Sequence, residues 1–279
     1  MRSFRIVAQR IRHLPGLDKC ERVWNILRKP YHRLLNIRGR GVPIRVGGAA
    51  DIRMPPEFAG GSWELHEPKT VEVFANWVRE RKNPLILDVG SSIGIFSAVA
   101  LFANSTAEVV AFDPDLASLA AVRRLCQYGQ PSRLRLVHCF VADKSSSILK
   151  IDGAVRLTEQ GLATANVTGD VGTTRYIALS AQLDGSIPIY SLDNLFEDCD
   201  FRSRPVLMKC DVEGAELKVL RGFEKTLRQS RPDLILSIHP PALSEYGSSK
   251  SEVADFLKQL GYCIKIIGID HEEHWWCEH

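Results

Sequence analysis

The chain has 279 residues and a net charge of only +3, with 45% hydrophobic and 25% charged residues. These fractions are average for folded globular proteins, and they exclude a disordered or fibrous chain. A chain of this length accommodates one α/β catalytic core with an extension, so we predict an N-terminal helical extension and linker at 1–63 and a catalytic domain at 64–279.

The first 40 residues carry the positive charge. They contain eleven Lys and Arg residues against Asp18 and Glu21, which leaves +9 in this segment and −6 in the remainder of the chain. Interleaved apolar residues indicate basic amphipathic helices, which can contact an anionic membrane, a nucleic acid or an acidic substrate. We favour a solvated helical cap, keep peripheral membrane contact through residues 1–40 as an alternative, and rank nucleic-acid binding below both.

Other sequence features bear on location and redox state. The longest nearly apolar stretch, residues 93–103, is too short to cross a bilayer. Arg10 and Arg12 interrupt the N-terminus before an apolar signal region forms, so we expect a cytoplasmic protein. Seven cysteines are scattered without a Cys-x-x-Cys pair, a pattern that favours reduced thiols over disulfides or a zinc site.

From Thr70 onward, short β-branched runs alternate with helical periodicity, as in βαβ units that build a parallel sheet. The predicted strands are 85–89, 108–112, 134–140, 206–210 and 233–238. The predicted helices are 94–104, 115–127, 215–228 and 250–260, the last with Ser249 or Ser251 as its N-cap. Two final runs, 262–267 and 274–277, predict an antiparallel C-terminal hairpin.

The pattern loosens between 143 and 205 into Ser-, Thr- and Gly-rich segments. An insertion of this length in a compact domain is usually functional. We therefore expect residues 143–205 to help recognise a substrate.

The first motif is the predicted strand 85–89 followed by a glycine-containing turn and a helix. Gly90 and Gly94 allow the backbone to approach a ligand, and the helix N-terminus offers free N–H groups. A dinucleotide fingerprint would need glycine at 90, 92 and 95, but the chain has Ser92 and Ile95. The spacing therefore disfavours an NAD(P)-dependent oxidoreductase.

Acidic residues follow the second and third predicted strands. Asp113 ends the second strand, where a carboxylate can accept both hydrogens of a ribose diol. Asp143 follows the third strand and could reach the exocyclic amine of an adenine. The residues that we expect at the cofactor are Asp88, Gly90, Ser91, Gly94, Asp113 and Asp143, with Asp88 supporting the loop.

The most distinctive segment surrounds the end of the fourth predicted strand. It places Asp211, Glu213 and Glu216 within six residues, where the carboxylates repel one another. Such clusters tend to mark functional sites, although Glu216 could simply favour a helix N-terminus.

With these segments in view, the chain resembles the FkbM family of methyltransferases from about Glu64 to the C-terminus. The matching motifs are Leu87-Asp88-Val89-Gly90, Phe112-Asp113-Pro114, Ser191-Leu192-Asp193-Asn194-Leu195 and Lys209-Cys210-Asp211-Val212-Glu213-Gly214-Ala215-Glu216. The resemblance implies a Rossmann-like class I methyltransferase fold, with a mostly parallel seven-stranded sheet and an antiparallel C-terminal hairpin. It also implies S-adenosyl-L-methionine as methyl donor and O-methylation of a hydroxyl on a sugar or secondary metabolite.

Three residues are candidates for the acceptor side of that reaction: Asp211, Glu213 and His239. His239 follows the fifth predicted strand, and imidazole titrates near neutrality, so it suits a general base for a small-molecule or glycan hydroxyl. A structural histidine is an equally good interpretation. His271, His274 and His279, with Glu272 and Glu273, fit no standard metal spacing, so we expect a polar turn and no metal.

Overall fold

The computed structural model describes residues 39–145, 175–177 and 187–279, the side chains of 175–177 excepted. The predictions for residues 1–38, and for most of the insertion 143–205, lie outside the described residues.

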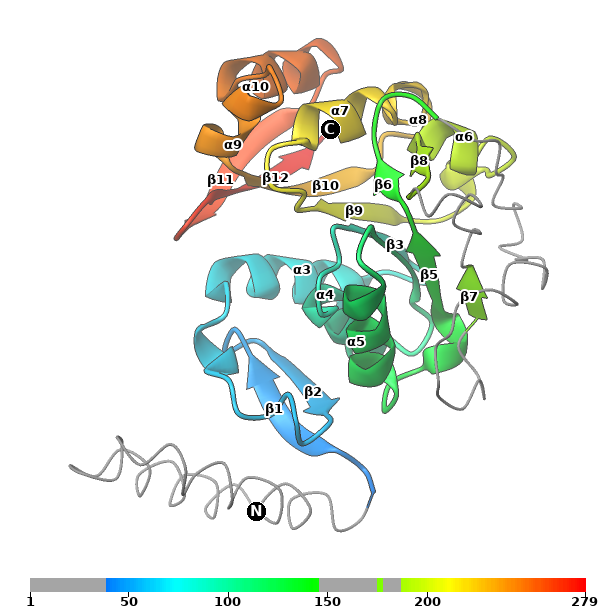
Figure 1. Ribbon diagram of the computed structural model, residues 1–279, viewed down its shortest axis with the longest axis vertical. Coiled ribbons are helices and arrows are strands. Elements are labelled where there is room, and N and C mark those ends of the chain that lie inside the picture. The colour runs from blue at the N-terminus through cyan, green and yellow to red at the C-terminus, as the bar shows by residue number, and fades with distance from the viewer. Residues whose placement is uncertain (1–38, 146–174, 178–186) are drawn as a thin grey trace.

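The core is one twisted sheet covered by helices on both faces (Figure 1). Within the described residues it has eight strands in the spatial order β11-β12-β10-β9-β3-β4-β5-β7. They are β3 (Leu85–Val89), β4 (Glu108–Asp113), β5 (Leu134–His138), β7 (Arg175–Ile177), β9 (Val206–Cys210), β10 (Asp233–Ile238), β11 (Cys263–Ile269) and β12 (Glu273–Glu278).

The sheet is mostly parallel. β10, β9, β3, β4, β5 and β7 pair in parallel, whereas β12 is antiparallel to both β10 and β11. Without the three-residue β7 at the edge, seven strands remain, and they end in the antiparallel hairpin β11–β12. The predicted fold class is thus confirmed.

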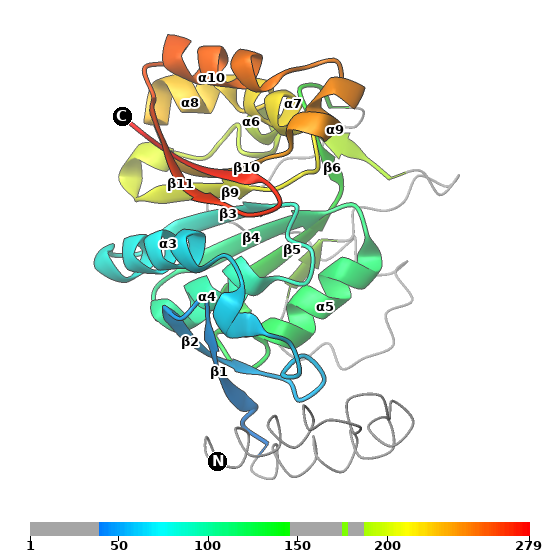
Figure 2. The same ribbon diagram turned by 90° about the vertical axis from the view of Figure 1, so that its left-hand side faces the viewer.

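Helices form a layer on each face of the sheet (Figure 2). α3 (Pro68–Glu80), α4 (Ile95–Ala103) and α5 (Leu116–Cys126) cover one face. The other face is covered by α6 (Leu192–Leu195), α7 (Glu216–Arg221), α8 (Glu224–Ser230), α9 (Pro240–Glu245) and α10 (Lys250–Gln259). Because side chains alternate along a strand, Leu85, Leu87 and Val89 pack in one apolar cluster and Ile86 in the other.

Several boundaries follow from local chemistry. Asp115 caps α5 by accepting from the amides of Ala117 and Ser118. Ser249, rather than Ser251, is the N-cap of α10, and it accepts from the amide of Glu252.

The predicted helix 215–228 is two helices, α7 and α8, separated at Gly222. A Cβ on Gly222 would lie 2.0 Å from the carbonyl oxygen of Ala142, so the chain passes too close for a side chain. Asp193 then caps α8, because its carboxylate accepts from the amides of Lys225 and Thr226. The Ser191–Leu195 motif therefore has a structural role at this break.

Residues 39–63 differ from the expected helical extension and linker. β1 (Val42–Val46) and β2 (Ala50–Met54) form an antiparallel hairpin, followed by a 3-10 turn at Trp63–Leu65. Their inward side chains belong to the same buried cluster as α3, α4 and α5. In packing, this hairpin is part of the catalytic domain.

Two short strands, β6 (Phe140–Val141) and β8 (Ile189–Tyr190), pair in parallel beside the sheet.

No helix among the described residues is both long enough and apolar enough to span a bilayer.

Candidate active site

The carboxyl ends of β3, β4, β9 and β10 meet at one edge of the sheet. β3 lies between β4 and β9, so the chain leaves β3 toward one side of the sheet and reaches β9 on the other. Such a switch point opens a crevice at the carboxyl ends of parallel strands.

The loop after β3 is shaped by two glycines with positive φ, Gly90 at 76° and Gly94 at 85°. A Cβ on Gly90 would lie 1.8 Å from the carbonyl oxygen of Asp211, and one on Gly94 would lie 2.7 Å from Val122 Cγ1. From the sequence, we expected these glycines to let the backbone approach a ligand. The structure gives a different reason for glycine at both positions, because a Cβ atom there would collide with neighbouring residues of the protein.

Asp88 is buried under this loop. Its Oδ2 accepts from Ser97 Oγ at 2.5 Å and from the Ser97 amide at 3.1 Å, so it satisfies a free donor in the first turn of α4. Burial raises the pKa of Asp88 to about 6, although the hydrogen bonds from Ser97 oppose that rise.

Asp113 lies at the end of β4, where its carboxylate accepts from the amides of Ser92 at 2.8 Å and Asp115 at 2.9 Å. Burial raises its pKa. Asp113 therefore joins the Gly90 loop to the start of α5. Asp143, in contrast, is exposed after β6, beside Gly222.

At the end of β9, a buried lysine holds Asp211. Lys209 Nζ donates to Asp211 Oδ2 at 3.0 Å and to Ser237 Oγ at 2.7 Å. Burial alone would raise the pKa of Asp211, but Lys209 lowers it below its usual value. Ser237 Oγ in turn lies 3.1 Å from His274 Nδ1, which extends the network to β12.

His239 is the centre of a carboxylate cluster. Its Nδ1 lies 2.9 Å from Oε1 of the fully buried Glu216, while its Nε2 lies 3.6 Å from Asp211, 3.5 Å from Glu213 and 3.9 Å from Glu272. The hydrogen bond to Glu216, and then the charges of Asp211 and Glu213, raise the pKa of His239 to about 9. The structure thus brings together the three predicted acceptor-side residues.

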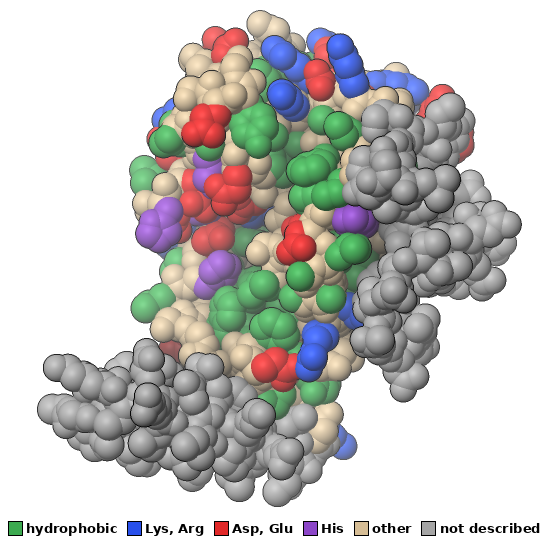
Figure 3. All heavy atoms as spheres, viewed as in Figure 1, with side chains coloured by type: hydrophobic (Ala, Val, Ile, Leu, Met, Phe, Trp, Pro, Cys, Tyr) green, Lys and Arg blue, Asp and Glu red, His purple; other side chains and the backbone are tan. Residues whose placement is uncertain are grey.

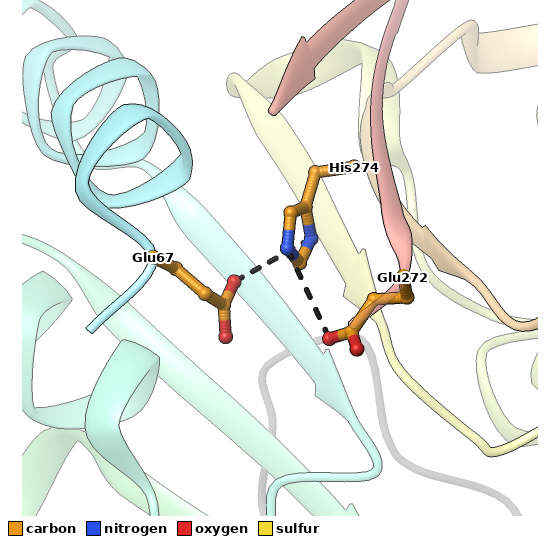
Figure 4. A group of neighbouring side chains, drawn as sticks. All are labelled: Glu67, Glu272 and His274. Atoms are coloured by element: carbon orange, nitrogen blue, oxygen red, sulfur yellow. Dashed lines mark ion pairs between the residues drawn. The ribbon is translucent and has the colours of Figure 1, made fainter. Parts of the chain in front are cut away.

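A second histidine lies beside this cluster (Figure 4). His274 Nδ1 is 3.5 Å from Glu67 Oε2, and His274 Nε2 is 3.9 Å from Glu272 Oε1. Glu67 precedes α3, whereas Glu272 lies in the β11–β12 turn, so the two carboxylates reach His274 from opposite sides. Acidic and histidine side chains gather on this face of the molecule (Figure 3).

The sequence analysis did not place four of these residues at the site: Glu67 and Lys209 were not considered for it, and Glu272 and His274 were assigned to a polar turn. Positive φ is rare and costly outside glycine, yet Glu67, Ser92 and Glu213 have φ of 36°, 49° and 51°. All three lie at this edge of the sheet. The other two non-glycine residues with positive φ among the described residues, Asn83 and Arg231, lie away from the site, just before β3 and β10.

The FkbM methyltransferase domain model matches residues 88–264, more than half of the chain. The chain belongs to the FkbM methyltransferase family. Its match to the AMB antimetabolite synthetase AmbE of Pseudomonas aeruginosa is 23% identical and covers 77% of this chain but only 12% of that protein. The chain therefore spans about an eighth of the length of this curated relative.

Solved structures with similarity to this FkbM family member share little sequence with it. The methyltransferase FkbM from Methylobacillus flagellatus is 15% identical, with a TM-score of 0.44 over 79% of this chain and 56% of that one. A methyltransferase from Geobacter sulfurreducens is 14% identical, with a TM-score of 0.40 over 98% and 95% of the two chains.

Family membership implies S-adenosyl-L-methionine as the methyl donor, and the first loop fits such a group. Ser91 is buried, and its Oγ has no hydrogen-bond partner among the described residues. An unpaired buried hydroxyl is costly, so a polar ligand at this loop would relieve it. The N-terminus of α4 offers further donors to a carboxylate.

Proposed function

We propose that the chain transfers a methyl group from S-adenosyl-L-methionine to a hydroxyl of a small molecule or glycan. The observation that carries this proposal is the convergence at one sheet edge of the Gly90 loop, Asp113 and the His239 cluster. Donor-binding and acceptor-binding groups then face the same crevice.

In this proposal, Gly90, Ser91 and Gly94 line the methionine end of the donor, Asp113 binds its ribose, and Asp143 lies toward its adenine. Asp88 acts indirectly by fixing the start of α4. The sulfonium activates the methyl carbon, so the protein mainly aligns donor and acceptor for in-line displacement. The carbon–sulfur bond breaks as the carbon–oxygen bond forms, neutral S-adenosylhomocysteine leaves, and the hydroxyl proton passes to a base.

The base is one of Asp211, Glu213 and His239. A base must be unprotonated to act, and the pKa of about 9 keeps a proton on His239 at neutral pH. Asp211 is ionised because Lys209 lowers its pKa. The free protein therefore favours a carboxylate over His239 as the proton acceptor.

Ligand-dependent melting tests the donor. S-adenosylhomocysteine should raise the melting temperature because it binds only the folded state, whereas NAD should not. Stabilisation by NAD alone would contradict the proposal.

Methyl transfer tests the acceptor. When the protein is incubated with a methyl-labelled donor and fractionated cell extract, the label should appear on a small molecule or a glycan. The label should survive mild alkali, which hydrolyses methyl esters but leaves methyl ethers intact. Label confined to alkali-labile esters would contradict the hydroxyl acceptor.

A further inference from the structure

Three side chains with metal-ligating atoms converge at the acceptor side of the crevice. Asp211, His239 and Glu272 each offer one atom within 4.8 Å of the other two. Asp211 follows β9, His239 follows β10, and Glu272 lies in the β11–β12 turn. The fold, rather than proximity in sequence, therefore assembles this group.

The imidazole of His239 is oriented as metal-binding imidazoles usually are. Its Nδ1 is held by the buried carboxylate of Glu216 at 2.9 Å, which leaves Nε2 toward the other carboxylates. A carboxylate behind the imidazole is the usual outer partner of a ligating histidine. Oε2 of Glu216 is buried beside the same ring and has no hydrogen-bond partner among the described residues.

The distances suit a shared ion better than direct hydrogen bonds. Nε2 lies 3.5 to 3.9 Å from oxygens of Asp211, Glu213 and Glu272, beyond the usual range of an N–H···O bond. If two ligand atoms each lie about 2.1 Å from one ion, they are about 3 Å apart when the ligand–ion–ligand angle is 90° and about 4.2 Å apart when it is 180°. The observed separations fall between these limits.

The charge balance also favours a cation. Carboxylates of Asp211, Glu213, Glu216 and Glu272 surround His239. Of the two carboxylate oxygens of Asp211, Oδ2 accepts from Lys209, whereas Oδ1 lies 3.6 Å from His239 Nε2.

The neighbouring group of Glu67, Glu272 and His274 is less suitable (Figure 4). His274 Nδ1 lies 3.1 Å from Ser237 Oγ, and Nε2 lies 3.2 Å from Asp270 Oδ1, so both nitrogens are already engaged.

We propose that Asp211 Oδ1, His239 Nε2 and Glu272 Oε2 bind one divalent cation. One imidazole with carboxylates suits an ion such as Mn²⁺, which accepts both nitrogen and oxygen ligands. With Asp211 and His239 as ligands, the remaining candidate base is Glu213, whose side chain is 82% exposed on the open side. A cation at this site would bind the acceptor oxygen and ease the loss of the hydroxyl proton. This catalytic role of the cation rests on the proposed function.

The test is a titration of the chelator-dialysed, full-length protein with Mn²⁺, in which electron paramagnetic resonance measures the free ion. The matched variants are Glu272→Gln and Glu273→Gln. Glu273 is adjacent to Glu272 in sequence, but its carboxylate accepts hydrogen bonds from Lys250 and Trp275 and is not one of the proposed ligands. Asp211→Asn is a second ligand variant, and melting curves check that each protein is folded.

We expect the wild type and Glu273→Gln to bind one equivalent of Mn²⁺, and Glu272→Gln and Asp211→Asn to bind at least about tenfold more weakly. No binding by the wild type, or equal binding by all variants, would overturn the inference. Stabilisation by S-adenosylhomocysteine, measured in parallel without metal, separates the two proposals. If it persists while Mn²⁺ fails to bind, only the cation site is wrong.

Discussion

At the scale of single residues, Asp88 makes a testable contribution to stability. Its pKa of about 6 in the folded protein exceeds the ordinary 3.8, so the folded state binds the proton more tightly than the unfolded state. The resulting stabilisation is complete below about pH 3.8 and is lost as the pH rises through about 6. The difference corresponds to about 3 kcal/mol.

The variant Asp88→Asn lacks this titration but keeps an oxygen for Ser97. We therefore expect the unfolding free energy of the variant, relative to wild type, to rise between pH 4 and pH 7. Urea denaturation at both pH values measures it. A constant difference would show that Asp88 does not titrate in this range.

Asp113 permits a second test at this scale. Asp113→Ala should weaken binding of S-adenosylhomocysteine by about 1–3 kcal/mol, the usual loss for hydrogen bonds to a charged group. Asp115→Ala is the matched control, because it removes the cap of α5 but no proposed ligand contact. Calorimetry giving both variants the same affinity would remove Asp113 from the donor site.

At the scale of elements, the turn from β3 to α4 depends on close packing against β9. Gly90 and Gly48 both have positive φ, but a Cβ on Gly90 would collide with the carbonyl of Asp211, whereas one on Gly48 would meet nothing within 4 Å. Gly48→Ala should cost about 1–2 kcal/mol for its backbone conformation alone. Gly90→Ala should cost more and abolish stabilisation by S-adenosylhomocysteine. Thermal unfolding of both variants, with and without S-adenosylhomocysteine, tests this difference. Equal losses of stability in the two variants would contradict the packing argument.

The sequence predicts the central strands to within a residue or two, because short runs such as Leu85–Val89 and Val206–Cys210, apolar except for Asp88 and Lys209, have few alternatives. It missed the β1–β2 hairpin although the signal was present. Both strands alternate buried and exposed residues around Gly47 and Gly48, but the sequence analysis assigned this stretch to the helical extension and linker at 1–63.

The candidate site was only partly predictable. Asp211, Glu213 and His239 follow strands whose carboxyl ends must meet at one edge of a parallel sheet. Glu67 and Glu272 are about 200 residues apart in sequence, and no local pattern pairs them. Their proximity follows from the position of β12 beside β10, a property of the whole topology.

At the scale of the whole molecule, the two possible N-terminal boundaries make opposite predictions. Deleting residues 1–38 should preserve folding and donor affinity, since the proposed helical cap contributes none of the residues placed at the site. Deleting residues 1–63 removes the buried strands of the hairpin and should unfold the domain. Circular dichroism and donor calorimetry distinguish these outcomes. A folded but non-binding 1–38 deletion would instead place that segment over the active site.

The position of β12 sets an order of events during folding. β12 follows every other strand in the sequence, yet it hydrogen-bonds to β10 on one side and β11 on the other. Until it inserts, these two strands lack their common neighbour, and the crevice lacks the Glu272 and His274 side chains that β12 and its turn supply. We therefore expect refolding protein to regain catalysis only after Trp275 and Trp276 on β12 are buried, so that closing the sheet and completing the site are a single late step.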